Sequence, residues 1–438
     1  MMGAEPAAAM AEVWQAACVQ MTGNPSEPGL AFLPWDIPLE EWPEDTVVAL
    51  PRGISRHIVR FVKIGSTVYA IKEIEQYYAD REYALLFELE RRDVPTVEPV
   101  AVVTDRVDRT GEPLPAALIT KHLQFSLPYR ALFSSSLRSE TADRLLDALA
   151  VLLVRLHLVG FSWNDCSLSN TLFRRDAGAF AAYLVDAETG EIHQHLSDGQ
   201  REYDLETAAT NVAGELMDLQ AGGRLQEGID PIVTGVGLRT RYDALWNEIT
   251  SPVVFDREDR YPLEARIRRL NELGFDFAEL QVITDASGDH VTVRPKVVDA
   301  GHHSRRLIRL TGLDVEENQA RRLLNDLDSY RVKIGLSAED EEIAAHRWVS
   351  DRFERVMEAV PHALRGRLEP AEIFHEVLEH RWFMSEREGR SVPFDSAITD
   401  YVDNVLAKKP EEKSVLGSRT GTPSDATAEL RIVIPSED

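Results

Sequence analysis

Five polar side chains in the first half of the sequence have the types that phosphoryl transfer requires. The reaction uses a cation that contacts the nucleotide phosphates, a carboxylate that holds this cation, ligands for magnesium ions and a base beside the acceptor hydroxyl. The chain offers candidates for these roles in the order Lys72, Glu82, Asp165, Asn170 and Asp186. Together they predict a site for phosphoryl transfer from ATP with the help of Mg²⁺.

The first pair of candidates lies in a strand and in the helix that follows it. Lys72 ends the run Val68-Tyr69-Ala70-Ile71-Lys72, in the arrangement of the Val-Ala-Ile-Lys signature of kinases, and is expected to contact the α and β phosphates. Glu82 lies on the next predicted helix, from which its carboxylate can reach back to the lysine. Glu88 and Glu90 on the same helix remain alternatives.

The second group follows a long predicted helix. Asp165 and Asn170 have the spacing Asp-x-x-x-x-Asn and precede the apolar run Thr171-Leu172-Phe173, so Asp165 is the candidate base and Asn170 a magnesium ligand. Asp186 ends the apolar run that starts at Tyr183 and is the second magnesium ligand. Glu188 is an additional candidate for the metal.

These motifs, in this order, resemble the protein-kinase-like superfamily. The chain is most similar to the branch of lipopolysaccharide (Kdo) kinases and RIO kinases, in which a serine can stand two residues after the catalytic aspartate, as Ser167 does. The runs 33–36 and 376–382 resemble actinobacterial proteins that join such a domain to an uncharacterised C-terminal domain. The resemblance covers about Pro38 to Leu219. It implies a two-lobed kinase fold, ATP, Mg²⁺ and a hydroxyl acceptor on a small molecule, sugar or protein.

Three departures from the kinase pattern stand out. Trp163-Asn164 replaces the His-Arg that usually precedes the catalytic aspartate, which argues against control by a phosphorylated activation loop. Ala187-Glu188 replaces the Phe-Gly after the metal ligand. The loop expected to cover the nucleotide has one glycine, and its phosphate-binding candidates are Gly53, Ser55 and Arg56. Asp204 is expected to anchor the catalytic loop from the next helix.

The elements around these residues predict an α+β fold. Five strands are expected at 46–50, 56–62, 67–72, 97–103 and 116–123, with helices at 79–92 and 140–159. Residues 1–24 are read as an N-terminal appendage with a helix from Pro6 to Met21. Residues 25–222 are read as the kinase-like domain, whose N-lobe ends near residue 123. Gly222-Gly223 is a predicted hinge to a smaller, mostly helical α+β domain over 223–407, and 408–438 is predicted to be disordered.

Composition limits the other function classes. The formal charge is −26, which opposes binding to nucleic acid phosphates or to anionic membranes. The two cysteines, Cys18 and Cys166, cannot form a disulfide framework. No lysine or arginine precedes Arg52, and no apolar run is long enough to span a membrane. We therefore expect a cytoplasmic protein.

Other functions stay open. A pseudokinase that binds nucleotide and acts as a scaffold, with a protein partner on the C-terminal domain, is the main alternative. A basic patch at 302–309 could bind phosphate or nucleic acid, although a salt-bridged helix is favoured. His375 and His380 are five apart and therefore diverge on a helix, which argues against a zinc site. Cys166 has no histidine placed to activate it as a nucleophile.

Overall fold

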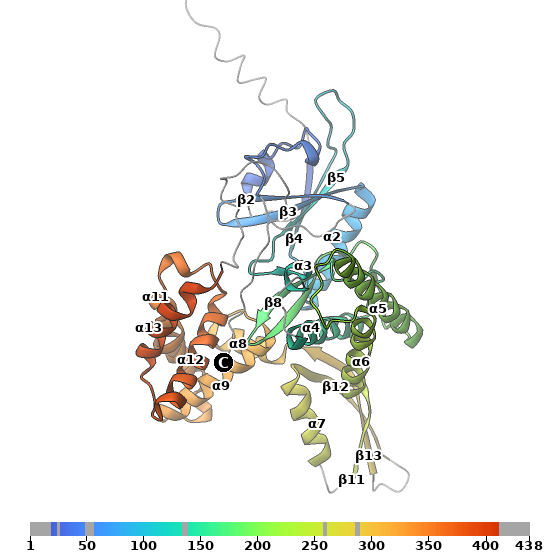
Figure 1. Ribbon diagram of the computed structural model, residues 1–438. Coiled ribbons are helices and arrows are strands. Elements are labelled where there is room, and N and C mark those ends of the chain that lie inside the picture. The colour runs from blue at the N-terminus through green and yellow to red at the C-terminus, as the bar shows by residue number, and fades with distance from the viewer. Residues whose placement is uncertain are drawn as a thin grey trace, which may run out of the picture.

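The computed structural model describes residues 19–23, 27–48, 57–133, 139–256, 261–284 and 290–410. An N-terminal sheet lobe lies at one end of the molecule, and a helical lobe lies beside it. The C-terminal helices lie on the opposite side of strand β8 (Thr171–Asp176) from helix α4 (Ser139–Leu158) (Figure 1). The two-lobed α+β fold followed by a mostly helical α+β region is confirmed. None of the described helices is long and apolar enough to cross a membrane.

The N-lobe is an antiparallel five-stranded sheet in the order β1-β4-β5-β3-β2, with one helix, α2, against β4 and β5. Its elements are β1 (Gln20–Gly23), β2 (Ile58–Ile64), β3 (Thr67–Ile74), α2 (Gln76–Arg91), β4 (Pro99–Thr104) and β5 (Ala116–Lys121), with short 3-10 turns η2 (Pro28–Phe32) and η3 (Leu39–Glu41). Lys72 pairs with Val59 on one side and Leu118 on the other, so its backbone is fixed by both neighbouring strands.

The fifth strand of this sheet is not the expected one. Residues 20–23 form β1, which pairs with β4, so the end of the predicted appendage and helix belongs to the sheet. β1 is a short, mostly exposed edge strand, and such a strand has no alternating apolar pattern to reveal it. Of the run 46–50, Val48 forms only an isolated bridge with Phe61, and residues 49–50 lie outside the described part, as do residues 1–18.

The helical lobe is built around α4. Leu145, Leu149, Leu152 and Leu156 recur at helical spacing and are all buried. Gly160 follows the helix with φ +79°, and a Cβ there would lie 2.2 Å from the carbonyl oxygen of His193. The lobe comprises β6 (Leu127–Pro128), α3 (Tyr129–Phe133), α4 (Ser139–Leu158), β7 (Phe161–Ser162), β8 (Thr171–Asp176), β9 (Ala179–Leu184), β10 (Glu191–Ile192), α5 (Asp198–Ala221) and α6 (Pro231–Thr250).

The boundary predicted at Gly222-Gly223 is not where the first core ends. Helix α6 follows these glycines, yet it packs against α4 and α5 and contributes Leu238, Tyr242 and Ile249 to the same core. The two glycines therefore make a turn within the lobe. Local turn chemistry alone could not distinguish this turn from an inter-domain hinge, because the difference lies in the packing of the next helix.

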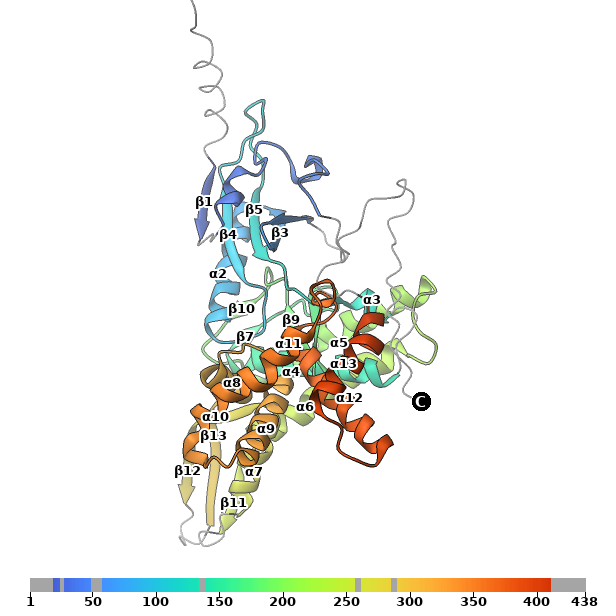
Figure 2. The ribbon, with the colours of Figure 1, turned by 90° about the vertical axis from the view of Figure 1, so that its left-hand side faces the viewer.

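The remaining chain forms a three-stranded sheet and a helical bundle. The sheet has the strand order β11-β13-β12, and α7 packs against β11 and β12. The bundle has its own core, which includes Leu327, Trp348 and Phe374. Helix α9 packs against β8, and Figure 2 shows α9 beside α8 and α10. These elements are β11 (Val253–Asp256), α7 (Tyr261–Glu272), β12 (Phe275–Thr284), β13 (His290–Ala300), α8 (His302–Thr311), α9 (Glu317–Lys333), α10 (Glu341–Trp348), η5 (Val349–Glu354), α11 (Arg355–Ala359), α12 (Pro370–Glu388) and α13 (Phe394–Asn404), with short turns η4 (Ala338–Asp340), η6 (His362–Leu364) and η7 (Leu406–Lys408).

Candidate active site

Lys72 is surrounded by three carboxylates from two different parts of the chain. Its Nζ donates to Glu82 Oε2 at 2.9 Å, to Asp186 Oδ2 at 3.0 Å and to Glu188 Oε2 at 3.4 Å. Strand β3 supplies the lysine, α2 supplies Glu82, and the segment after β9 supplies the other two. The structure thus brings the predicted lysine, its predicted partner and the predicted metal ligand into one cluster.

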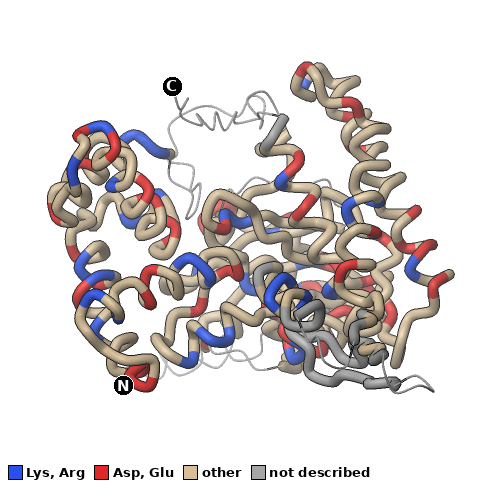
Figure 3. The backbone as a smooth tube through the Cα atoms, turned by 90° about the horizontal axis from the view of Figure 1, so that it is seen from below, with Lys and Arg blue, Asp and Glu red and all other residues tan. Residues whose placement is uncertain are grey.

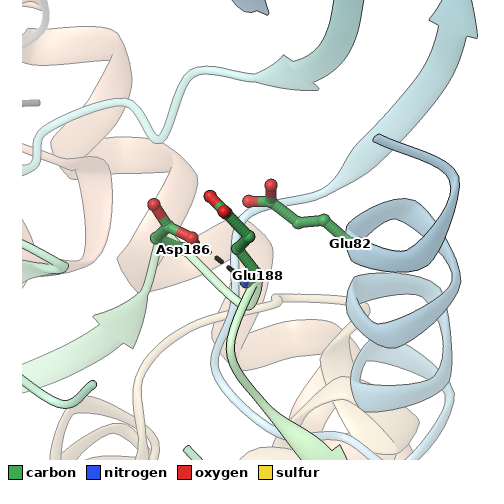
Figure 4. A group of neighbouring side chains, drawn as sticks. All are labelled: Glu82, Asp186 and Glu188. Carbon is green, nitrogen blue, oxygen red and sulfur yellow. Dashed lines mark hydrogen bonds between the residues drawn. The ribbon is translucent and has the colours of Figure 1, made fainter. Parts of the chain in front are cut away.

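The charges of this cluster are unbalanced. Glu82 is buried, and burial together with Asp186 raises its pKa to about 7, although Lys72 opposes the shift. Burial alone would lower the pKa of Lys72, but Glu82 and Asp186 raise it above its usual value, so the lysine stays charged. Each of the three carboxylates offers an oxygen within 4.8 Å of the others, and they point toward one another (Figure 4). One ammonium therefore faces a concentrated negative charge.

The catalytic loop holds Asp165 beside two amide side chains. The Nδ2 atom of Asn170 donates to Asp165 Oδ2 at 3.2 Å and to the Asp165 carbonyl at 3.1 Å. Asn211, on α5, donates to Asp165 Oδ1 at 3.3 Å and to the Cys166 carbonyl at 3.1 Å. Since both carboxylate oxygens accept a hydrogen bond, the orientation of the candidate base is fixed from two sides.

Asp204, on α5, anchors this loop, as the sequence predicted. Its carboxylate accepts the backbone N–H of Trp163 at 2.7 Å and that of Asn164 at 2.8 Å. Asn164 has φ +63°, a conformation that asparagine tolerates better than most residues. His157 Nε2 lies 3.1 Å from the same carboxylate, and its Nδ1 lies 2.6 Å from the hydroxyl of Tyr242 on α6. His157 is thus a buried hydrogen-bonding residue and not a base.

Hydrogen bonds to backbone atoms join the catalytic loop to the metal-ligand segment. Trp163 Nε1 donates to the Asp186 carbonyl at 2.8 Å, and Val185 N donates to the Asn170 carbonyl at 3.0 Å. Asp186 Oδ1 accepts the Glu188 N–H at 3.1 Å. Through these bonds Asn170 and Asp186, the two predicted magnesium ligands, are held as neighbours at the ends of one hairpin.

Four residues that the motifs do not include also shape the site. Arg81 donates to the carbonyls of Glu188 and Gly190, and His57 Nε2 lies 2.9 Å from Glu188 Oε2. Glu215 accepts the N–H of Leu168 at 2.7 Å, and Asn211 contacts Asp165. A signal for the last two existed in the sequence. Polar residues at 204, 211 and 215 repeat on one face of a helix that also buries Ala208, Val212 and Leu216.

The predicted phosphate-binding residues Gly53, Ser55 and Arg56 lie outside the described residues.

The ligand atoms at the site suit a hard cation. Asp186 and Glu188 offer carboxylate oxygens, and the amide nitrogen of Asn170 is used by Asp165, so its carbonyl oxygen is the atom that can ligate. Magnesium prefers such oxygen ligands in small number, with the rest of its shell taken from water and phosphate.

The competing sequence clusters have ordinary structural partners. His375 pairs with Glu379 while His380 pairs with Asp400, so the two histidines diverge as expected. In the basic patch, now α8, Arg306 pairs with Glu341 and Asp328. Basic and acidic residues are interspersed along the backbone (Figure 3). Cys166 is fully buried, and burial raises the pKa of its thiol well above the usual value, so it is a poor nucleophile.

Two family models match different parts of the chain. Residues 60–212 match the model of the lipopolysaccharide kinase (Kdo/WaaP) family, and residues 244–406 match a domain of unknown function, DUF4032. A solved structure described as WaaP in complex with acyl carrier protein is 16% identical, with a TM-score of 0.33, over 58% of this chain and 99% of that chain. A search of curated proteins found no match.

The family match covers the strand with Lys72, the catalytic loop and the segment with Asp186. The coarse class predicted from these motifs, a kinase-like phosphotransferase domain, is therefore confirmed. The chain thus joins a region that matches the lipopolysaccharide kinase (Kdo/WaaP) family, over residues 60–212, to a region that matches DUF4032, over residues 244–406.

Proposed function

We propose that the protein is an ATP- and Mg²⁺-dependent phosphotransferase that transfers the γ-phosphoryl group to a hydroxyl. The observation that carries the proposal is the position of Lys72 Nζ, 2.9 Å from Glu82 Oε2 and 3.0 Å from Asp186 Oδ2. A lysine held by a buried carboxylate, next to a carboxylate that can ligate a metal, is the arrangement that phosphoryl transfer uses.

The residues divide into two functions around the transferred group. Lys72 would contact the nucleotide phosphates, and Glu82 would keep the lysine in place. Asp186 and Asn170 would hold the magnesium, with Glu188 as a further ligand. When bound, the ion neutralises the charge of the phosphates. The surplus negative charge of the cluster supports this assignment, because an added cation would relieve the repulsion between the three carboxylates.

Asp165 would accept the proton of the acceptor hydroxyl. Asn170 and Asn211 each donate to one of its oxygens, which orients the carboxylate. The acceptor itself is a hydroxyl on a small molecule, a sugar or a protein. The name of the family refers to a lipopolysaccharide, whose sugar hydroxyls belong to this chemical class.

The loop should not depend on phosphorylation. Asn164 occupies the place of the arginine that would read a phosphate, and its amide donates to the Thr189 carbonyl at 3.2 Å. Trp163 is fully buried against the same segment. Direct side-chain contacts therefore order the metal-ligand segment, and we expect the protein to be active as purified, with or without phosphatase treatment.

The test uses γ-labelled ATP with Mg²⁺, in the presence and absence of a cell lysate, followed by separation of protein and small-molecule products. Label should leave ATP with the wild type and not with Lys72→Met. Lys63→Met is the matched control, because Lys63 is an exposed lysine of the neighbouring strand. ATP binding without any transfer or release of label would overturn the proposal and favour a nucleotide-binding scaffold.

A further inference from the structure

The tip of the β8–β9 hairpin supplies the N-terminal cap of a helix in the DUF4032 domain. Asp176 ends β8 and is buried, and its carboxylate accepts the backbone N–H groups of Asn318 at 3.1 Å and Gln319 at 2.7 Å. The Asn318 side chain donates to it as well, at 2.9 Å. Helix α9 has no side-chain cap of its own, since its N-cap residue Glu316 makes no such bond. A carboxylate from the kinase-like domain satisfies these first-turn donors instead.

Glu316 turns toward the hairpin. It accepts a hydrogen bond from the hydroxyl of Tyr183, on β9, at 2.5 Å, and forms an ion pair with Arg174, on β8, at 3.1 Å. Arg174 also pairs with Glu369, just before α12. Asp176 of the hairpin caps α9, and Glu316, the N-cap residue of α9, binds the hairpin. Each domain therefore supplies a carboxylate that accepts hydrogen bonds from the other domain.

A third set of contacts holds the turn of the hairpin. Glu372, buried on α12, accepts the N–H of Ala177 at 3.0 Å and the amide of Gln319 at 3.1 Å. Ala177 has φ +51°, so this contact fixes a backbone conformation that alanine rarely adopts. The tip of the hairpin is thus held by α9 and α12 together.

The same hairpin carries the predicted metal ligands at its other end. Its strands are paired without interruption from Thr171 and Leu184 to Asp176 and Ala179. Asn170 directly precedes β8, and Asp186 lies two residues after β9. Six residue pairs therefore connect the tip of the hairpin to the two ligands.

We propose that the DUF4032 domain is a positioning unit of the active site, which holds the β8–β9 hairpin so that Asn170 and Asp186 bind the metal together. Asp176, Glu372 and Tyr183 are the positioning residues. The inference rests on the proposed function, because it assigns the metal to these two ligands. It gives the domain a role in the same reaction and requires no separate ligand for it.

The variants are Asp176→Asn, which removes the charge of the cap, and Tyr183→Phe, which removes only one hydroxyl and therefore should fold. Asp403→Asn is the control, because Asp403 is an exposed aspartate on α13, in the DUF4032 domain and away from the hairpin contacts described above. In the full-length protein, the Mg²⁺ concentration that gives half-maximal ATP turnover should rise at least about fivefold in the first variant and about twofold in the second. ATP affinity in EDTA should not change.

Amide hydrogen exchange over residues 165–190 gives a second measurement that does not need activity. The positioning variants should exchange faster at Val185 to Glu188, and Asp403→Asn should match the wild type. An unchanged Mg²⁺ requirement together with unchanged exchange in Tyr183→Phe and in Asp176→Asn would overturn the inference. If the wild type did not turn over ATP, the proposed function would fail, and the exchange data would still decide whether the domain holds the ligand segment.

Discussion

Two charged clusters lie along the β8–β9 hairpin, one beyond its open end and one beside its strands toward the tip. At the active site, Lys72 faces Glu82, Asp186 and Glu188. At the domain junction, Arg174 pairs with Glu316 and Glu369, and Asp176 lies two residues further along β8. In each cluster the acidic residues outnumber the lysine and arginine residues.

The clusters differ in what else meets the carboxylates. At the junction, backbone N–H groups of α9 bind Asp176, and Tyr183 binds Glu316. At the candidate active site the carboxylates gather around Lys72, with His57 beside Glu188, and their oxygens come within 4.8 Å of one another. Burial of charge costs free energy unless donors or a counter-ion compensate it. The backbone donors of α9 make the junction structural, whereas the surplus charge at the candidate active site suits an added cation.

The largest effect on catalysis is expected at Asp186. Asp186→Asn should lower kcat/KM for Mg-dependent ATP turnover by about a hundredfold, because a charged contact of this kind is worth about 1.5–3 kcal/mol. Mg²⁺ should no longer strengthen ATP binding in this variant. Calorimetric titration with ATP, with and without EDTA, measures this effect. Glu191→Gln is the control, since Glu191 is exposed and pairs only with His193 among the contacts described. A variant that kept the metal effect would place the ion elsewhere.

At the domain junction, the expected effect of a substitution is a lower free energy of unfolding. Arg174→Met leaves the largely buried Glu316 and Glu369 without their cation, and breaking a fully buried pair costs about 3–5 kcal/mol, so a loss of about 2–3 kcal/mol is expected. Urea denaturation should show the loss in the transition that includes the C-terminal helices. Arg355→Met breaks the exposed pair with Asp395 and should cost less than about 1 kcal/mol. Equal losses in the two variants would mean that the junction is no more than a surface contact.

A smaller effect is expected at Glu82, where the matched control lies on the same helix. Glu82→Gln keeps a hydrogen bond to Lys72 but loses the charge, so ATP turnover should fall about tenfold. Glu88→Gln should leave turnover within about twofold, because Glu88 pairs with Arg91 and Arg92 on the helix surface. Steady-state kinetics of both variants decide which glutamate holds the lysine. The reverse order of losses would assign that role to Glu88.

The smallest effect is a pH dependence of stability at the junction. Burial, aided by Glu316, raises the pKa of Asp176 from 3.8 to about 7, and burial raises that of Glu369 to about 7. In this range the folded protein binds more protons than the unfolded chain, so the free energy of unfolding falls as the pH rises. The stability of the wild type relative to Asp176→Asn should therefore be lower at pH 8 than at pH 5. Parallel curves for the two proteins would contradict this sign.

Several elements could be predicted because their signals are local. Lys72 ends an apolar strand, Asp165 and Asn170 keep a fixed spacing, and the leucines of α4 recur at helical intervals. The edge strand β1 and the role of α6 were missed. β1 has too few residues for a pattern, and α6 follows two glycines that suit a hinge as well as a turn.

The sequence by itself determined which residue types are available for phosphoryl transfer and in which order they occur. Only the tertiary structure decided that Asn211 orients Asp165, that Glu82 rather than Glu88 meets Lys72, and that Asp176 caps a helix more than a hundred residues away. The physical reason is the separation along the chain of the residues that fix each feature. A motif is set by neighbours along the chain, whereas the partner of a buried charge depends on which helices pack together, and no short stretch of sequence specifies that packing.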